Sequence, residues 1–167
     1  LKSINMYAFQ DCTSLISIEI PSSVTSLGSG VFQGCVSLRN VILSENLTRI
    51  ASSTFLNCKS LIYIDLYNFN TSNVTTMYMM FSTCNSMVTL DVSKFNTSSV
   101  KNMYSMFENC QKLTNLNLKN FNTSAATSMY KMFCGCSNLI YLDLGNFSTK
   151  SLDNSGLHAV DYMFTNC

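Results

Sequence analysis

The chain has 167 residues, of which 47% are hydrophobic and 11% charged, and its formal net charge is +1. This length and apolar content suit one domain with a substantial core, which excludes an intrinsically disordered chain. The near-neutral charge provides no basic field for nucleic acid or an anionic membrane, and no run of about 18 apolar residues predicts a membrane-spanning helix.

A cysteine recurs along the whole chain at successive spacings of 23, 23, 26, 26, 26 and 31 residues. These residues are Cys12, Cys35, Cys58, Cys84, Cys110, Cys136 and Cys167. A phenylalanine stands three residues before each cysteine, and apolar residues follow six of them at three, six and eight residues. A fixed period in this range predicts stacked units. We predict one continuous solenoid over residues 1–167, with 23-residue repeats in 1–58 and 26-residue repeats in 59–167.

Each repeat begins with a short predicted strand after its cysteine. The last two apolar positions alternate with polar residues, as at Ile18 and Ile20 in the first unit and Leu142 and Leu144 in a late one. Strands that recur every 23 or 26 residues cannot pair through tight hairpins, so successive strands must lie parallel. The predicted fold class is therefore an α/β repeat, a right-handed solenoid with a parallel β-sheet on one face.

The return segment that follows each strand is predicted to be helical. In the 26-residue units, apolar residues lie three and four positions apart, as at Val74, Met77, Met80 and Phe81, which predicts one buried helical face. Serines are predicted to cap these helices, namely Ser72, Ser98 and Ser124. The 23-residue units leave fewer residues and predict a tighter helical or 3₁₀ turn. Five further residues in the last unit predict an inserted, protruding loop near 150–158.

Two sequence motifs resemble known repeats. The run Cys-x-Ser-Leu to Ile-Pro-Ser-Ser-Val-Thr-Ser-Leu-Gly, from Cys12 to Gly28, is similar to the BspA-type leucine-rich repeat. The later units, such as 66–81 and 118–133, contain Asn-Phe-Asn-Thr-Ser and Met-Tyr-x-Met-Phe and resemble a related 26-residue repeat of bacterial surface lipoproteins. The resemblance implies a leucine-rich-repeat solenoid from a cell-surface or secreted, adhesin-like protein of bacteria or some protists. It further implies a partner such as a host matrix or cell-surface protein.

The regular cysteines are predicted to form a buried column of free thiols. Coils in register place equivalent residues about 4.8 Å apart with parallel side chains, which keeps their Cβ atoms farther apart than a disulfide prefers. Cys134 lies off the column, two residues before Cys136, and is predicted to be the accessible thiol. With a single histidine, His158, and no Cys-x-x-Cys pair, we predict no metal and no cofactor.

The open face of the sheet carries acidic, polar and tyrosine side chains in adjacent rows, which is typical of a recognition surface. The residues predicted to contact a partner are Tyr63, Asp65, Tyr67, Asp91, Asn117, Tyr141 and Asp143. The alternative interpretation is that these side chains are ordinary solvent-exposed residues of the strands and bind no partner. Tyr78, Tyr104 and Tyr130 form another row on the return side, either as packing with exposed hydroxyls or as an aromatic contact strip.

The sequence favours a non-catalytic, protein-binding module. It shows no nucleophile paired with a base and no Gly-rich phosphate loop, so we do not expect an enzyme. The alternative is a carbohydrate-binding, ice-binding or structural array that uses the Asn-Thr-Ser ladders. We expect no nucleic-acid partner, membrane attachment only through an anchor outside this chain, and end-to-end self-association because both ends are expected to lie within a longer array. The N-terminal residues lack the zones of a signal peptide.

Overall fold

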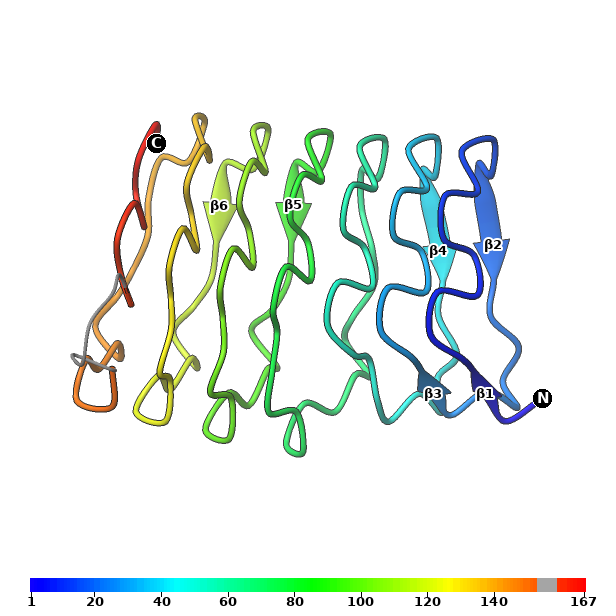
Figure 1. Cartoon of the computed structure of the whole chain (residues 1–167), viewed down its shortest axis with the longest axis horizontal. Coiled ribbons are helices and arrows are strands. Elements are labelled where there is room, and N and C mark those ends of the chain that lie inside the picture. The colour runs from blue at the N-terminus through cyan, green and yellow to red at the C-terminus, as the bar shows by residue number, and fades with distance from the viewer. Residues whose placement is uncertain (153–158) are drawn as a thin grey trace.

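The computed structural model describes residues 1–152 and 159–167 as a single row of stacked coils (Figure 1). Most of the loop predicted near 150–158, with Asp153, Asn154, Gly156 and His158, lies outside the described residues. Each coil runs through a strand, a corner and a return segment before the next begins. The prediction of a solenoid of short parallel strands is confirmed.

The strands of the main face overlap the predicted apolar-polar-apolar triplets, and each begins one residue before its triplet. They are β2 (Ser17–Glu19), β4 (Asn40–Ile42), β5 (Thr89–Leu90) and β6 (Asn115–Leu116). β2 pairs in parallel with β4, with Ser17 opposite Asn40, and β5 pairs in parallel with β6, with Thr89 opposite Asn115. The sequence therefore placed the strand positions correctly, because alternation within each triplet sends one set of side chains into the core.

A second ladder runs along the coils just before the return segment, and the sequence pattern did not predict it. Its strands are β1 (Ser3–Ile4) and β3 (Ser26–Leu27), which pair in parallel. A bridge from Ser26 to Arg49 extends this ladder by one coil. A separate run of bridges joins Thr76 to Asn102 and Asn102 to Ser128.

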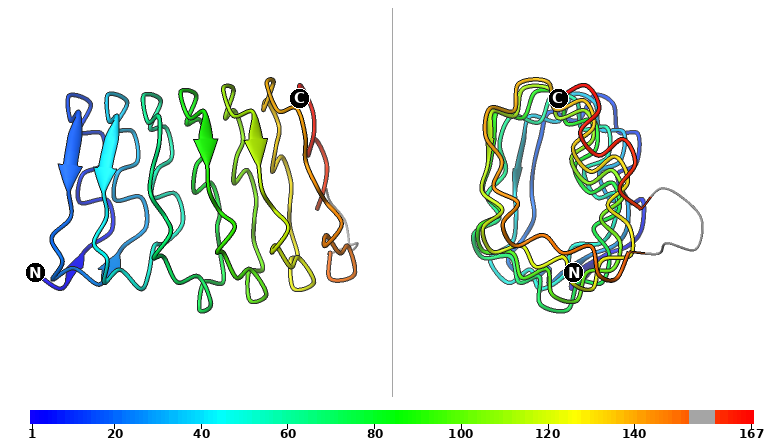
Figure 2. Two further views of the ribbon diagram at one scale, coloured as in Figure 1. Left: turned by 180° about the vertical axis from the view of Figure 1, so that it is seen from behind. Right: turned by 90° about the vertical axis from the view of Figure 1, so that its left-hand side faces the viewer.

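The prediction of helical return segments is wrong, because no helix occurs in residues 1–152 or 159–167. The residues five and one before each cysteine have left-handed backbone angles, for example φ of 50° at Met79 and 62° at Thr83. The N–H of Phe81 donates to the carbonyl of Met106 in the next coil at 3.0 Å instead of to its own segment. The return segment is thus a chain of tight turns hydrogen-bonded between coils, opposite the strands in the end-on view of Figure 2.

Tight turns reproduce the spacing that predicted a helix, because a reversal every four residues also brings residues three and four apart to one side. The distinguishing signal lies in the residue before each cysteine. This position is occupied by Asp11, Gly34, Asn57, Thr83, Asn109, Gly135 and Asn166. Glycine, asparagine and aspartate are the residues that tolerate positive φ best, and they fill six of these seven positions.

The longer repeats gain their extra length at the corner after the strand rather than in a helical turn. Phe69, Phe95 and Phe121 occupy this corner and are almost fully buried. Thr97, also fully buried, donates its hydroxyl to the carbonyl of Asn122 at 3.0 Å and accepts the N–H of the same residue at 2.7 Å. Thr71 and Thr123 make the same pair of bonds to the following coil.

The predicted helix caps therefore have another role. The N–H of Ser72 donates to the side-chain oxygen of Asn70 at 2.9 Å, which forms a two-residue turn at the corner. Ser98 and Ser124 make the equivalent bonds to Asn96 and Asn122. The Asn-Thr-Ser triplets thus build the corner: asparagine closes a turn within one coil, and threonine joins that coil to the next.

The core is held in register by ladders that continue from coil to coil. The phenylalanines three residues before the cysteines stack with ring centroids 5.6–6.0 Å apart. The interior cysteines are buried free thiols, as predicted. Each donates Sγ–H to the phenylalanine carbonyl of the preceding coil, as Cys84 does to Phe55 and Cys110 to Phe81, both at 3.2 Å. A thiol suits this position because it is compact and apolar and still carries a weak donor.

Candidate functional site: the seam and the open strand face

The boundary between the last 23-residue unit (36–58) and the first 26-residue unit (59–84) is called the seam here. Backbone hydrogen bonds cross it in the return turns, where Ser53 donates to Tyr78, Phe55 to Met80 and Asn57 to Ser82 at 2.9–3.1 Å. No backbone hydrogen bond joins residues 36–50 to residues 61–76. Backbone hydrogen bonds therefore join the two units along the return turns, and none joins them along the strand face or the second ladder.

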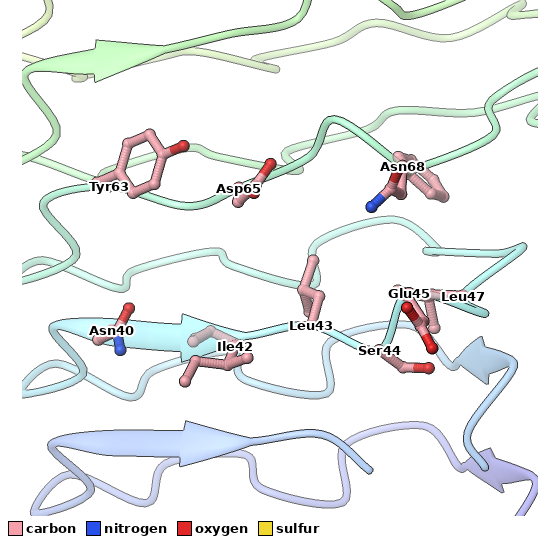
Figure 3. A pocket seen from close by; sticks show the side chains of 11 residues that line it. Asn40, Ile42, Leu43, Ser44, Glu45, Leu47, Tyr63, Asp65 and Asn68 are labelled. Carbon is pink, nitrogen blue, oxygen red and sulfur yellow. The ribbon is translucent and has the colours of Figure 1, made fainter. Parts of the chain in front are cut away.

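A hollow of about 300 Å³ opens over the seam on the strand face (Figure 3). Asn40 and Ile42 line it from β4, and Tyr63 and Asp65 line it from the neighbouring coil. Leu47 and Phe69 form deeper parts of its wall, and both are almost fully buried. The hollow exists because the strand segment 61–67 does not pair with β4, so the apolar layer beneath is left partly uncovered.

Large apolar side chains of the two coils that border this hollow are exposed, and two of them, Ile42 and Tyr63, line it. Ile42 is 52% exposed, Ile62 50%, Tyr63 50% and Tyr67 63%. Ile62 is not among the contact residues predicted from sequence, and it belongs to a row four residues after the regular cysteines. This row comprises Ile16, Arg39, Ile62, Val88, Thr114 and Ile140. Since these positions lie between the inward apolar positions of the repeat, an isoleucine or valine there was the available signal for an exposed apolar patch.

The aspartates and the asparagine in the middle of the apolar-polar-apolar triplets have a structural role that the sequence did not reveal. Asp65 accepts the N–H of Tyr67 at 2.9 Å, and Asp91 accepts the N–H of Ser93 at 2.9 Å. Asn117 and Asp143 make the equivalent bonds two residues ahead. The row therefore closes the turn that ends each strand, which asparagine can do as well as aspartate. The hydroxyl and N–H of Ser93 also lower the pKa of Asp91 below its usual value.

The structure divides the predicted contact residues into two groups. Tyr63 and Asp65 line the hollow at the seam, and Tyr67 follows them beneath Lys94, whose ammonium lies 5.3 Å from the ring centroid. The second group is farther along the sheet, at another hollow of about 310 Å³ that is lined by Asn117, Tyr141 and Asp143. Asp91 lies on a strand position between the two groups and lines neither of these hollows.

A family model described as the BspA type leucine rich repeat region matches six copies in the chain, over residues 2–140 and 79–167. The chain belongs to the BspA-type leucine-rich-repeat family. The matched region covers both repeat lengths, so the 23- and 26-residue units are variants on one family framework.

Solved leucine-rich-repeat proteins share this fold. The TpLRR protein of T. pallidum is 27% identical, with a TM-score of 0.59 over 84% of this chain and 61% of that one. A leucine-rich repeat protein from Bacteroides ovatus ATCC 8483 is 22% identical, with a TM-score of 0.57 over 83% of this chain and 34% of that one. The chain thus spans less than two thirds of either protein. A search of curated proteins found no match.

The tyrosine row on the return side of this leucine-rich-repeat chain is a stack. The ring centroids of Tyr78 and Tyr104 are 5.2 Å apart and those of Tyr104 and Tyr130 are 4.9 Å apart. All three side chains are half-buried. Lys131 lies 5.3 Å from the Tyr130 centroid and forms an ion pair with Glu108 at 3.9 Å. Because the ring faces cover one another, this geometry favours the packing interpretation over an aromatic contact strip.

The thiols divide into a protected column and three accessible groups. Burial raises the pKa of Cys35 to about 11 and that of Cys136 to about 12, and it raises those of Cys84 and Cys110 well above the usual value. Cys134 is only half-buried, as its place off the column predicts. It shares accessibility with Cys12 and Cys167 of the two end coils, which are exposed.

The described residues add two negative findings. Outside 153–158, no three histidine, cysteine, aspartate or glutamate side chains come close enough together to hold a metal ion. The same part of the chain contains no helix with the length and hydropathy needed to cross a membrane.

Proposed function

We propose that the chain is a non-catalytic, protein-binding module of an adhesin-like bacterial protein at the cell surface or in secreted form. Its family and the repeat architecture support this class of function. The proposed docking surface is the open strand face around the seam, and the proposed partner is a host matrix or cell-surface protein.

The observation that carries this proposal is the set of exposed apolar side chains in the two coils that border the hollow, of which Ile42 and Tyr63 line it. Four large apolar side chains there are at least half exposed to solvent, namely Ile42, Ile62, Tyr63 and Tyr67. Contiguous exposed apolar surface is typical of interaction sites. Tyrosine provides contact area with few rotatable bonds, so it loses little entropy when a partner binds.

Charge around the hollow suggests the chemistry of the partner. Glu45 and Asp65 line the hollow, and Asp91 directly follows β5 in the next coil. Lys94 is a nearby cation, placed over the Tyr67 ring. The excess of carboxylates favours a partner with a basic patch, whose binding should weaken with added salt because exposed charges are screened beyond about 8–10 Å.

The alternative array of Asn-Thr-Ser hydroxyls finds no support in the geometry. Thr71, Thr97 and Thr123 have exposed fractions of 0–1%, and each hydroxyl is bonded to the backbone of the next coil. A hydroxyl in this position cannot face a carbohydrate chain or an ice lattice. The periodic threonines therefore belong to the framework.

The test is a binding experiment with a matched control. The purified chain is measured against a panel of immobilised extracellular-matrix proteins, as wild type and as the double variant Tyr63→Ser, Tyr67→Ser. The control is Tyr7→Ser, because Tyr7 has a similar exposed fraction of 49% but lies in a return turn. We expect the double variant to lose roughly tenfold or more in affinity while the control binds as wild type.

Asp65→Asn sharpens the same test, since an amide oxygen keeps the turn to Tyr67 while the charge is removed. We expect weaker binding with reduced salt dependence. Equal affinities for wild type and the double tyrosine variant would move the site away from the seam, and no binding to any matrix protein in the panel would contradict the proposed partner class.

A further inference from the structure

The second ladder is interrupted at the seam, and the interruption leaves backbone and side-chain donors without partners. Bridges run from Ser26 to Arg49 on one side and from Thr76 to Asn102 on the other, with none from Arg49 to Thr76. One side-chain contact spans this part of the seam, between the hydroxyls of Ser52 and Thr76 at 3.2 Å. The ladder breaks here because the corner changes length between the two units.

The missing bonds can be identified by comparison with equivalent residues. Thr48 donates both its N–H and its hydroxyl to the carbonyl of Thr25, at 2.9 and 3.0 Å. Thr127 does the same to Lys101, at 2.7 and 3.0 Å. At the seam, neither the N–H nor the hydroxyl of Thr75 bonds to Thr48 or to any other described residue. The N–H of Ile50 also lacks the partner that Leu27 and Met103 find in the next coil.

These donors surround a hollow of about 390 Å³. It is lined by Ser29, Thr48, Arg49, Ile50, Ala51, Ser52, Asn73, Val74, Thr75 and Thr76. It shares no residue with the hollow on the strand face. Arg49 provides a cation at its rim, and its guanidinium makes no ion pair or hydrogen bond within the described part of the chain. The site therefore offers several donors, carries one positive charge unpaired within the described residues, and combines hydroxyl and amide groups with apolar side chains.

We propose that this hollow binds an acidic sugar, with Arg49 holding the sugar carboxylate. A guanidinium can donate two parallel hydrogen bonds to a carboxylate, and the free N–H and hydroxyl of Thr75 can donate to the ring substituents. Asn73, Ser52 and Thr76 offer both donors and acceptors to sugar hydroxyls. The volume lies at the small end of the range for ligand sites, which suits one sugar ring. The protein-docking surface on the strand face is not required for this binding.

The experiment uses the full chain labelled with ¹⁵N and titrated with glucuronate, followed by NMR chemical shifts. We expect saturable shifts at Thr75, Ile50 and Arg49, with a Kd of about 1 mM for such a small ligand. Glucose tests whether the charge is needed, and acetate tests whether a carboxylate alone suffices. We expect both to bind roughly tenfold or more weakly than glucuronate.

The chain has two arginines, and the second provides the control. Arg49→Gln should weaken glucuronate binding roughly tenfold or more, whereas Arg39→Gln on the strand face should leave it unchanged. Both side chains are exposed, so neither substitution should disturb folding. The proposal is overturned if Arg39→Gln is equally damaging, if glucose binds as well as glucuronate, if acetate binds as well as glucuronate, or if no shifts occur at the seam up to about 10 mM.

Discussion

The 23-residue coils of 1–58 and the 26-residue coils of 59–167 share their return turns, their thiol column and one phenylalanine stack, and they differ at one corner. The longer coils add a buried phenylalanine and a buried threonine there, such as Phe95 and Thr97. The shorter coils turn the same corner with leucine or valine, such as Leu47 and Val24. Repeat length in this solenoid therefore sets the structure of the corner, and the β-ladders are interrupted at the joint between the two lengths.

The largest expected difference concerns the row of buried corner phenylalanines. Phe95 packs against Phe69 on one side and Phe121 on the other, with centroids 5.6 and 6.5 Å away. Phe95→Ala should destabilise the chain by about 3–5 kcal/mol in urea unfolding, because it leaves an enclosed cavity. Phe69→Ala should cost less, since Phe69 borders the hollow at the seam and its cavity can open to solvent. Equal losses would mean that the seam is as closed as the interior joints.

Alkaline pH tests the thiol column that both regions share. Below about pH 7.5 the thiols are almost entirely neutral in the folded and unfolded chain, so they add little pH dependence. As the pH rises above 9, the unfolded chain releases thiol protons while buried Cys84 and Cys110 keep theirs, because burial raises their pKa values. Each should cost about 1.4 kcal/mol of stability at pH 10.

Urea unfolding at pH 7, 9 and 10 measures this loss, and Cys110→Ala should flatten the decline between pH 9 and 10. In the shorter region the pKa of Cys35 rises to about 11, so its contribution should level off earlier. An unchanged slope in the Cys110→Ala variant would contradict the burial of the column.

Threonines in the two regions should respond unequally to the same substitution. Thr97→Val removes a buried hydroxyl that both donates to and accepts from Asn122, so we expect a loss of about 2 kcal/mol in unfolding free energy. Thr48→Val removes one exposed hydroxyl bond to Thr25, and we expect a loss below about 0.5 kcal/mol. Comparable losses would show that the corner ladder does not distinguish the repeats.

The last prediction concerns the reactivity of the thiols toward alkylation and involves no change in the stability of the chain. Brief treatment of the folded chain with iodoacetamide should label Cys12, Cys134 and Cys167 while Cys84 and Cys110 stay unmodified, because the latter are fully buried. Mass spectrometry of peptides measures the extent at each site. Early labelling of Cys84 would place the column outside the core.

The sequence predicted the framework well at positions where the same residue type recurs because the side chain is buried in every coil. The phenylalanine and cysteine positions and the apolar triplets located the stacked core and the parallel strands, because inward side chains repeat at fixed register. The return segments were mispredicted because tight turns and helices both produce spacings of three and four. The decisive residues, such as Gly34 and Asn57, act through backbone angle rather than hydropathy.

The candidate site was predictable in part. Tyr63 and Asp65 were placed on the correct face and lie together at the hollow. Their neighbour Ile62 was missed although the apolar residues of its row were an available signal, and Arg49 was missed because nothing within one coil shows that its side chain lacks a partner. Arg49 gains its setting from the change of repeat length between two coils, which is a property of the joint and not of either unit.

Amide hydrogen exchange measured by NMR at single-residue resolution tests the open seam most directly. The N–H of Lys101 donates to Thr75 at 2.8 Å and that of Thr127 donates to Lys101 at 2.7 Å, whereas the equivalent N–H of Thr75 has no partner in the described structure. We predict that the Thr75 amide exchanges roughly 100-fold or more faster than the amides of Lys101 and Thr127. Protection of Thr75 equal to that of Lys101 would show that the ladder continues through the change of repeat length, and would contradict the account.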